Sequence, residues 1–400
     1  MFNWLTNKKT RLRFKRNWSW VARAEKVDAL TVRLVSKRPT PFAVARLART
    51  PIFPQHVHAP LKKKNLFGTK PVGTGMYRAT QVDRNKGVVM VKNPAYKHGG
   101  KGKPASNIGR AHVLPVTDVG TQIAQMLAGN IEITRALTFD EASGLGRDPR
   151  YNFTLAQSLS YIYMYFDTVN RSGIGVFGDK RVREALAMAV NRDLVPTVRS
   201  GKKKLPRGNP QSLCWILQAG CGFSAKLPAY DPAGAKKLLA EAGHPNGFAV
   251  KLTAFGSVKD FATVIAGDLI KIGVKATVEP VTFAAYRKKQ RDGKIQINAN
   301  AWSAGAIADV AGTMGFYFLP GSRDYIKNKA LHKLSRQINA EMDDTKRRAL
   351  TKKLLDKVIE ERYIVPISGL PLPIVHTVDV SLRGGRIQPH GYYMTDLNWK

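Results

Sequence analysis

The chain has 400 residues, 44% of them hydrophobic, so it is long enough for two or three domains, and its composition excludes a disordered or fibrous protein. Its formal net charge is +37, because 65 Lys and Arg stand against 28 Asp and Glu. No run reaches about 18 uninterrupted apolar residues, so no membrane-spanning segment is expected. Residues 1–21 also lack the apolar stretch of a secretory signal peptide.

The N-terminal part begins with a basic, aromatic run over residues 1–26. Residues 28–36 then alternate Leu30, Val32 and Leu34, which predicts a half-buried strand with these side chains inward. Turn-rich sequence and a short strand at 87–92 follow before the first clear helix, at 117–129, which Thr117 or Asp118 caps and Gly129 ends.

The middle of the chain contains a buried strand and two helices. YIYMYF at 161–166 has no polar alternation, which predicts a strand buried on both faces. Residues 179–190 predict an amphipathic helix, and Asp231-Pro232 starts another that ends at Gly243.

Strands and helices alternate from residue 248 on, which predicts an α/β lobe. The expected elements are strand 248–253, helix 258–272, strand 274–281, helix 283–291 and strand 294–301, the last with Ile295 and Ile297 on one face. A long helix follows over about 330–362 and is expected to break near Asp343-Asp344. From Tyr363 on, the sequence predicts short apolar strands.

No motif assembles a catalytic centre or a metal site. GIGVFG at 173–178 fits a dinucleotide-binding pattern, but residues 167–172 separate it from the strand, so we interpret it as a loop. His56 and His58 could point the same way from a strand, but no third ligand is near in sequence. We therefore expect a binding protein rather than an enzyme, with no cofactor and no metal.

Cys214 and Cys221 are the two cysteines of the chain. Their spacing excludes a CxxC redox pair and leaves two possibilities, buried thiols or a local disulfide. A disulfide here would close a small loop and stabilise the fold by about 2.5 kcal/mol.

The segment 301–318, AWSAGAIADVAGTMGFYF, is poor in charge and rich in small residues. It follows the carboxyl end of the strand 294–301, where ligands bind in open α/β sheets. Trp302 would supply a flat apolar wall there, and the alternative is a packed surface loop.

Several stretches together resemble the family 5 extracytoplasmic solute-binding proteins, the peptide, nickel and opine receptors of bacterial ABC importers. They are PVGTGMY at 71–77 with VKNPAY at 91–96, QIAQMLAGNIEI at 122–133, DKRVREALAMAVNRD at 179–193 and YDPAGAKKLLAEAGHPNG at 230–247. The resemblance runs from about residue 22 to the end, and its last three motifs are highly specific.

This resemblance implies an α/β, two-lobed architecture with a hinge, with crossovers at 161–168 and 364–368 and a first lobe that looks incomplete. The expected divisions are 1–75 as a remnant of the first-lobe extension, 76–167 with 366–400 as the first lobe, and 168–365 as the second. A second chain could complete the first lobe. The resemblance also favours the disulfide between Cys214 and Cys221.

The resemblance also implies that a solute binds between the lobes. The residues expected to line the site are Trp302, Ser303, Ala304, Gly305, Tyr161, Tyr163, Asp309 and Phe316. Asp309 could pair with a cationic solute group or cap a helix. Peptide receptors of the family carry an acidic residue shortly after the Trp, whereas this chain has Ala304-Gly305, which argues against a free peptide N-terminus as the ligand.

The implied function is the substrate-binding component of a periplasmic ABC importer, which captures a peptide or opine-like solute and delivers it to an inner-membrane permease without catalysis. The charge supports an alternative, a protein that keeps the receptor fold but binds a polyanion such as nucleic acid or an anionic membrane surface. Another interpretation of the charge is that engineering or drift made the surface of an ordinary receptor cationic. Lysine-rich turns occur along the whole chain, which favours a general surface property.

Overall fold

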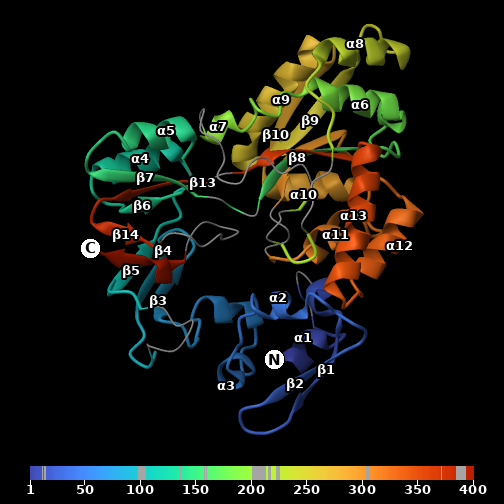
Figure 1. The fold of residues 1–400 in the computed structure, drawn as a ribbon. Helices are drawn as coiled ribbons and strands as arrows, with labels where there is room; N and C mark the ends of the chain where they lie inside the picture. The colour runs from blue at the N-terminus through green and yellow to red at the C-terminus, as the bar shows by residue number, and fades with distance from the viewer. Residues whose placement is uncertain are drawn as a thin grey trace.

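Figure 1 shows the chain as a computed structural model. It describes residues 1–10, 12, 15–97, 105–135, 137–156, 158, 160–200, 213–214, 218–221, 226–302, 307–370, 372–383 and 393–400. Within these ranges, no helix combines the length and the apolar character needed to cross a membrane.

The largest sheet joins strands from distant parts of the chain in the order β10–β9–β11–β8–β12. Strands β9, β10 and β11 are parallel, whereas β8 runs antiparallel to both β11 and β12. The strands are β8 (Tyr161–Phe166), β9 (Ala249–Phe255), β10 (Lys275–Val281), β11 (Ile297–Trp302) and β12 (Ile364–Gly369).

Strand β8 is buried along its whole length, as the sequence predicts. Ile162, Met164 and Phe166 pack into the hydrophobic cluster on one side of the sheet. The tyrosines that alternate with them pack into the cluster on the other side. Because successive side chains of a strand point to opposite faces, β8 contributes to both cores.

Helices cover both faces of this sheet (Figure 1). One cluster contains side chains of α6 (Lys180–Ala189), α8 (Pro232–Glu241) and α9 (Lys259–Lys271). The other contains side chains of α10 (Phe283–Asp292), α11 (Ala311–Tyr317), α12 (Lys329–Ile338) and α13 (Asp344–Glu360). The expected cap at Asp231 forms, since its carboxylate accepts from the Gly234 amide, and Asp179 caps α6 by accepting from the Arg181 amide.

Outside this sheet and its helices, the described residues form smaller sheets and short helices. The sheets are β1 (Val21–Lys26) with β2 (Val32–Ser36), β3 (Tyr77–Asp83) with β4 (Gly87–Lys92) and β5 (Arg110–Val113), β6 (Ile133–Thr134) with β13 (Leu372–Thr377) and β7 (Tyr151–Ala156), and β14 (Val380–Leu382) with β15 (Leu397–Trp399). The helices are α1 (Phe2–Thr6), α2 (Ala43–Leu47), α3 (Gln55–His58), α4 (Val119–Leu127), α5 (Phe139–Leu145) and α7 (Thr197–Ser200).

The chain crosses twice, side by side, between the large sheet and the β6–β13–β7 sheet. One crossing joins β7 to β8 and the other joins β12 to β13. The Leu370 amide donates to the Ser160 carbonyl at 3.0 Å, and the Ser158 hydroxyl donates to the Leu370 carbonyl at 2.7 Å. The two predicted crossover strands are therefore neighbours, although the predicted domain boundaries stay a prediction.

The structure corrects several sequence predictions. The strand expected at 28–36 begins at Val32, and Leu30 is 97% exposed at the tip of the β1–β2 hairpin rather than inward. Ile295 precedes β11 and packs into a different cluster from Ile297, so the two do not share a face. The long C-terminal helix is indeed broken, because Asp343 caps α13 by accepting from the Lys346 amide.

His56 and His58 lie on the short helix α3 rather than on a strand. The His58 ring packs against Trp4 with ring centroids 4.8 Å apart and against Phe53 at 5.1 Å. Within the described residues, no group of three or more His, Cys, Asp and Glu side chains could hold a metal ion.

This packing makes the stability of the N-terminal region sensitive to acid. Desolvation by burial, followed by the charge of Lys64, lowers the pKa of His58. Since the folded state favours the neutral ring, stability is full above the ordinary His pKa of about 6.5 and declines as the pH falls below it. We expect the loss of melting temperature between about pH 7.5 and about pH 5 to be smaller in His58→Phe than in the wild type. His56→Gln, at an exposed position, should keep the wild-type pH dependence, and an unchanged profile in His58→Phe would contradict the prediction.

Candidate functional site

The predicted site lies at the edge of the large sheet from which the chain crosses to the neighbouring sheet. Trp302, the last residue of β11, is in register with Tyr161, the first residue of β8. Tyr161 is also in register with Gly369 at the end of β12. Trp302 therefore lies at the carboxyl end of its strand and beside both crossings, which is where ligands bind in sheets of this kind.

Two aromatic rings of α11 pack against Trp302, and tyrosines of β8 pack behind them. Its ring centroid is 4.0 Å from that of Phe316 and 5.3 Å from that of Tyr317, and its Nε1 donates to Thr313 Oγ1 at 3.1 Å. Tyr317 packs in turn against Tyr163 at 5.5 Å. Trp302 and Phe316 are half-buried, whereas the two tyrosines are buried. The predicted residues Trp302, Phe316, Tyr161 and Tyr163 thus form one aromatic cluster with an accessible side.

Buried amides support this cluster from within the sheet. Asn298 Nδ2 donates to the hydroxyl of Tyr163 at 3.1 Å and to that of Tyr286 at 3.0 Å. Asn300 Nδ2 donates to the Thr253 carbonyl at 3.0 Å. Burial raises the pKa of Tyr161 and of Tyr163 well above its ordinary value, so both stay neutral at physiological pH.

The surroundings of Phe316 are positively charged. The guanidinium carbon of Arg323 lies 4.6 Å from the Phe316 ring centroid, and that of Arg287 lies 5.7 Å from it. Desolvation by burial raises the pKa of the nearby Tyr286, and the charges of the same two arginines partly oppose that rise. This electrostatic environment is favourable to a negatively charged group.

Asp309 is held in a buried ion pair. Arg347 Nη1 donates to Asp309 Oδ2 at 2.9 Å, and both side chains are at most 3% exposed. Asp309 Oδ1 also accepts from the Ala311 amide at 2.7 Å, at the start of α11, which is close to the capping role that the sequence left open. With its oxygens engaged in this way, Asp309 is a structural residue in this conformation, and we leave it out of the proposed site.

The segment after Trp302 is only partly described. Ser303, Ala304 and Gly305 lie outside the described residues, so their role stays a prediction. The later part of the segment folds as helix α11 rather than as the surface loop that was the alternative, because Met314 and Tyr317 pack into the core. Thr313, which accepts the hydrogen bond from Trp302, was not expected to contribute.

A disulfide joins Cys214 to Cys221, with 6.0 Å between their Cα atoms, as the resemblance implied. Within this loop, the Ala219 amide donates to the Ala308 carbonyl at 2.9 Å, and the Val310 amide donates to the Ala219 carbonyl at 3.1 Å. Gly220 has φ +79°, and a Cβ there would lie 2.7 Å from Val310 Cγ2. The disulfide thus holds a tight turn against the chain that leads into α11.

Removing this disulfide should destabilise the protein measurably. We expect the double variant C214S/C221S to lose about 2.5 kcal/mol of unfolding free energy, because the reduced chain regains loop entropy when unfolded. Urea unfolding measures the loss, and the wild type under reducing conditions should reproduce it. Equal stability of the oxidised wild type and the variant would contradict the prediction.

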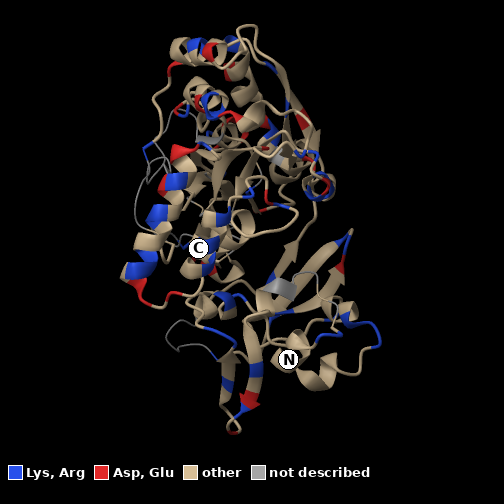
Figure 2. Ribbon diagram, turned by 90° about the vertical axis from the view of Figure 1, so that its right-hand side faces the viewer, with Lys and Arg blue, Asp and Glu red and all other residues tan. Residues whose placement is uncertain are grey.

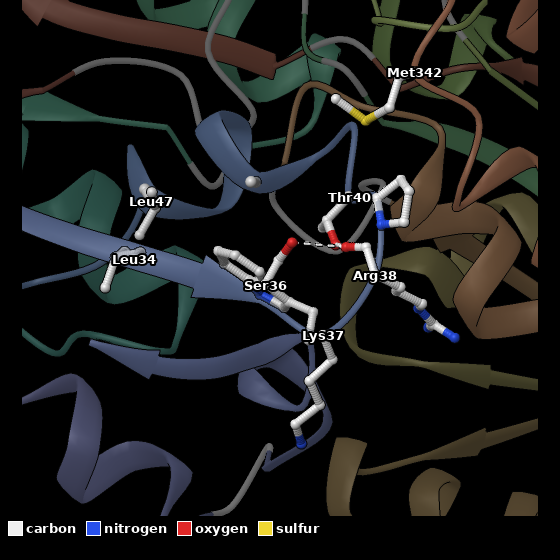
Figure 3. A pocket seen from close by; sticks show the side chains of 10 residues that line it. Leu34, Ser36, Lys37, Arg38, Thr40, Leu47 and Met342 are labelled. Carbon is white, nitrogen blue, oxygen red and sulfur yellow. Dashed lines mark hydrogen bonds between the residues drawn. The ribbon is translucent and has the colours of Figure 1, made fainter. Parts of the chain in front are cut away.

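A cavity of about 610 Å³ lies elsewhere, between the N-terminal segment and the loop that joins α12 to α13. Figure 3 shows Met342 of that loop on one side and Leu34, Ser36 and Lys37 of the N-terminal segment on the other, with the Lys37 side chain pointing away from Met342. The lining residues are Trp20, Leu34, Ser36, Lys37, Arg38, Pro39, Thr40, Ala43, Leu47 and Met342. None of them was expected to form a site, because the sequence gives no sign that Met342 meets the N-terminal segment.

Comparisons with known proteins identify the class. The family model described as "Bacterial extracellular solute-binding proteins, family 5 Middle" matches residues 1–324. The chain therefore belongs to family 5 of the bacterial extracellular solute-binding proteins.

Individual relatives are distant. The glutathione-binding protein GsiB of Pectobacterium atrosepticum is 27% identical over 310 residues, which cover 75% of this chain and 57% of that protein. Heme-binding protein A of Haemophilus influenzae is 25% identical over 306 residues, which cover 70% of this chain and 51% of that protein. The chain spans about half the length of the curated relatives it matches.

Solved structures agree on the fold. NikA from Brucella suis, solved with Fe(III)-EDTA, has a TM-score of 0.83 at 22% identity, and the match covers 96% of this chain and 80% of that one. AppA from Clostridium difficile, described as a putative peptide binding protein, has a TM-score of 0.79 at 18% identity, and the match covers 100% of this chain and 84% of that one. The predicted two-lobed, periplasmic-binding-protein-like α/β architecture is therefore confirmed.

Proposed function

We propose that this protein is the solute-binding component of a periplasmic ABC importer, which holds a small solute between two lobes and delivers it to an inner-membrane permease. No catalysis is involved, since a bound solute that contacts both lobes stabilises the closed form by binding alone. Family membership supports this proposal.

One observation supports this position for the solute site. The half-buried Trp302 and Phe316 rings lie at the sheet edge beside the two adjacent crossings, so a solute on these rings would also be close to the neighbouring sheet. A flat apolar wall on a rigid strand end gives such a solute a large contact area.

The chemistry of the cluster favours a carboxylate-bearing solute, such as a peptide C-terminus or an opine-like compound. Arg287 and Arg323 supply positive charge beside Phe316. The carboxylate of Asp309 is engaged by Arg347, so it offers little to the ammonium of a free peptide.

Isothermal titration calorimetry tests the proposal with three probes of this class, namely glutathione, the dipeptide Met-Leu and agropinic acid. We expect saturable one-to-one binding of at least one probe, with an affinity that changes little between about 50 mM and about 500 mM salt. Absence of binding by all three, together with no small molecule retained by the purified protein, would refute the proposal.

A further inference from the structure

Although lysine-rich turns occur along the whole chain, more than half of its net positive charge lies in the N-terminal part. Residues 1–117, which we call the cationic segment, contain 25 Lys and Arg but only three acidic residues, for a net charge of +22 out of +37. Figure 2 shows Lys and Arg on the strands and loops around the N-terminus, where Asp and Glu are scarce.

The three carboxylates of the cationic segment neutralise little of this charge. Glu25 pairs with Arg23 at 2.6 Å and with Arg33 at 3.7 Å. Asp28 accepts from the Leu30 amide at 2.7 Å, and Asp83 accepts from the amides of the β3–β4 turn. Lys62 and Lys63 are exposed in the turn after α3.

Exposed aliphatic side chains accompany the cations. Half of the large hydrophobic residues that are exposed in the described part of the chain lie between residues 27 and 114, less than a quarter of its length. Leu30 is 97% exposed and Val32 59% exposed at the β1–β2 hairpin, which projects at the outer end of the N-terminal region in Figure 1. Val44 on α2 is 78% exposed.

The hairpin and the lysine turn belong to one packed unit. Asn3 Nδ2 donates to the Ala24 carbonyl on β1 at 3.2 Å, and the Ala24 amide donates to Asn3 Oδ1 at 3.0 Å. Trp4, on the same helix as Asn3, packs against His58. Lys64 Nζ then donates to the Ala59 carbonyl at 2.6 Å, which fixes the turn that carries Lys62 and Lys63.

Several aromatic rings that the structure describes in this segment are engaged in packing. Phe2 contacts Trp18 with ring centroids 6.1 Å apart, Phe53 contacts Phe67 at 4.7 Å, and Trp20 is 5% exposed. Single-stranded nucleic-acid sites need open rings on which bases stack. Exposed aliphatic side chains among cations instead suit the headgroup region of an anionic bilayer.

We propose that the cationic segment is a docking surface for an anionic lipid bilayer. Lys and Arg, including Lys62 and Lys63, attract the headgroups, and the β1–β2 hairpin inserts Leu30 among them. This orientation would leave the large sheet, at the other end of the molecule in Figure 1, away from the lipid. The proposal does not depend on which solute the protein binds.

Vesicle sedimentation with the full chain tests this surface, using phosphatidylcholine vesicles with and without phosphatidylglycerol. We expect binding only to the anionic vesicles, and a decline in binding as salt is raised. K62E/K63E should bind at least about tenfold more weakly. L30S should also bind the anionic vesicles about tenfold more weakly, because it lacks the apolar side chain that inserts into the bilayer. Both changes are at exposed positions, and circular dichroism checks that the variants fold.

A matched control is K236E/K237E on α8, which makes the same charge change at exposed positions outside the cationic segment. It should bind within about twofold of the wild type, since charges farther than a Debye length from the lipid contribute little. The proposal is overturned if this control loses as much binding as K62E/K63E, if L30S binds like the wild type, or if a stoichiometric amount of a single-stranded oligonucleotide displaces the protein from the vesicles.

Discussion

Replacing Arg347 with Met should destabilise the protein by about 3–5 kcal/mol, because it leaves the Asp309 carboxylate buried without its counter-charge. The ion pair joins α13 to the start of α11, and Arg347 Nε also donates to the Ile338 carbonyl at 3.1 Å at the end of α12. One side chain therefore ties three helices of the lobe together, beside the turn that carries Gly220.

Urea unfolding measures this effect, and Arg348→Met is the matched control on the same helix. Arg348 pairs with Asp344 at 2.7 Å, but their side chains are 41% and 61% exposed, so its loss should cost at most about 1 kcal/mol. The double variant D309N/R347M should recover part of the loss, since it removes both charges. If the Arg347 and Arg348 variants lose the same unfolding free energy, the buried ion pair stabilises the fold no more than the exposed one, which would contradict the prediction.

Replacing Trp302 with Ala should weaken solute binding by about 30-fold or more, because truncation of a central aromatic side chain in a binding site typically costs about 2 kcal/mol or more. The variant removes the indole that stacks on Phe316, while Tyr161 and Tyr163 remain buried in the core. Calorimetry with the probe that the wild type binds best measures the loss.

Two controls separate binding from folding in this experiment. W302F keeps an aromatic wall and should retain most of the affinity. W399A removes a Trp that is 41% exposed on β15 and should bind like the wild type. If W302A binds normally, or if W399A loses as much affinity, the wall of the site is not at Trp302.

The helices and the central strands could be predicted from local signals. Asp179, Asp231 and Asp343 lie at helix starts where their carboxylates meet free amides, and this geometry depends only on neighbouring residues. The apolar run of β8 likewise requires burial on both faces wherever the strand lies.

Features that depend on distant partners could not be predicted in this way. Strand β1 reads VARAEK, with too little apolar alternation to indicate a strand, and it forms because β2 pairs with it. Asp309 is paired with Arg347, which lies 38 residues away in sequence, so the pattern around it could not distinguish a ligand contact from an ion pair. The sequence indicated Trp302, Phe316, Tyr161 and Tyr163, but not Tyr317 or Thr313. These two contact Trp302 only because α11 packs against the sheet.

Native mass spectrometry of the wild type and W302A, each purified gently from the same native host, tests the solute site most directly. We predict that the wild type carries one small molecule per chain and that W302A, folded by circular dichroism, carries none or much less. A wild type that never retains a small molecule, or a W302A variant that retains it equally, would contradict a solute site at the end of β11.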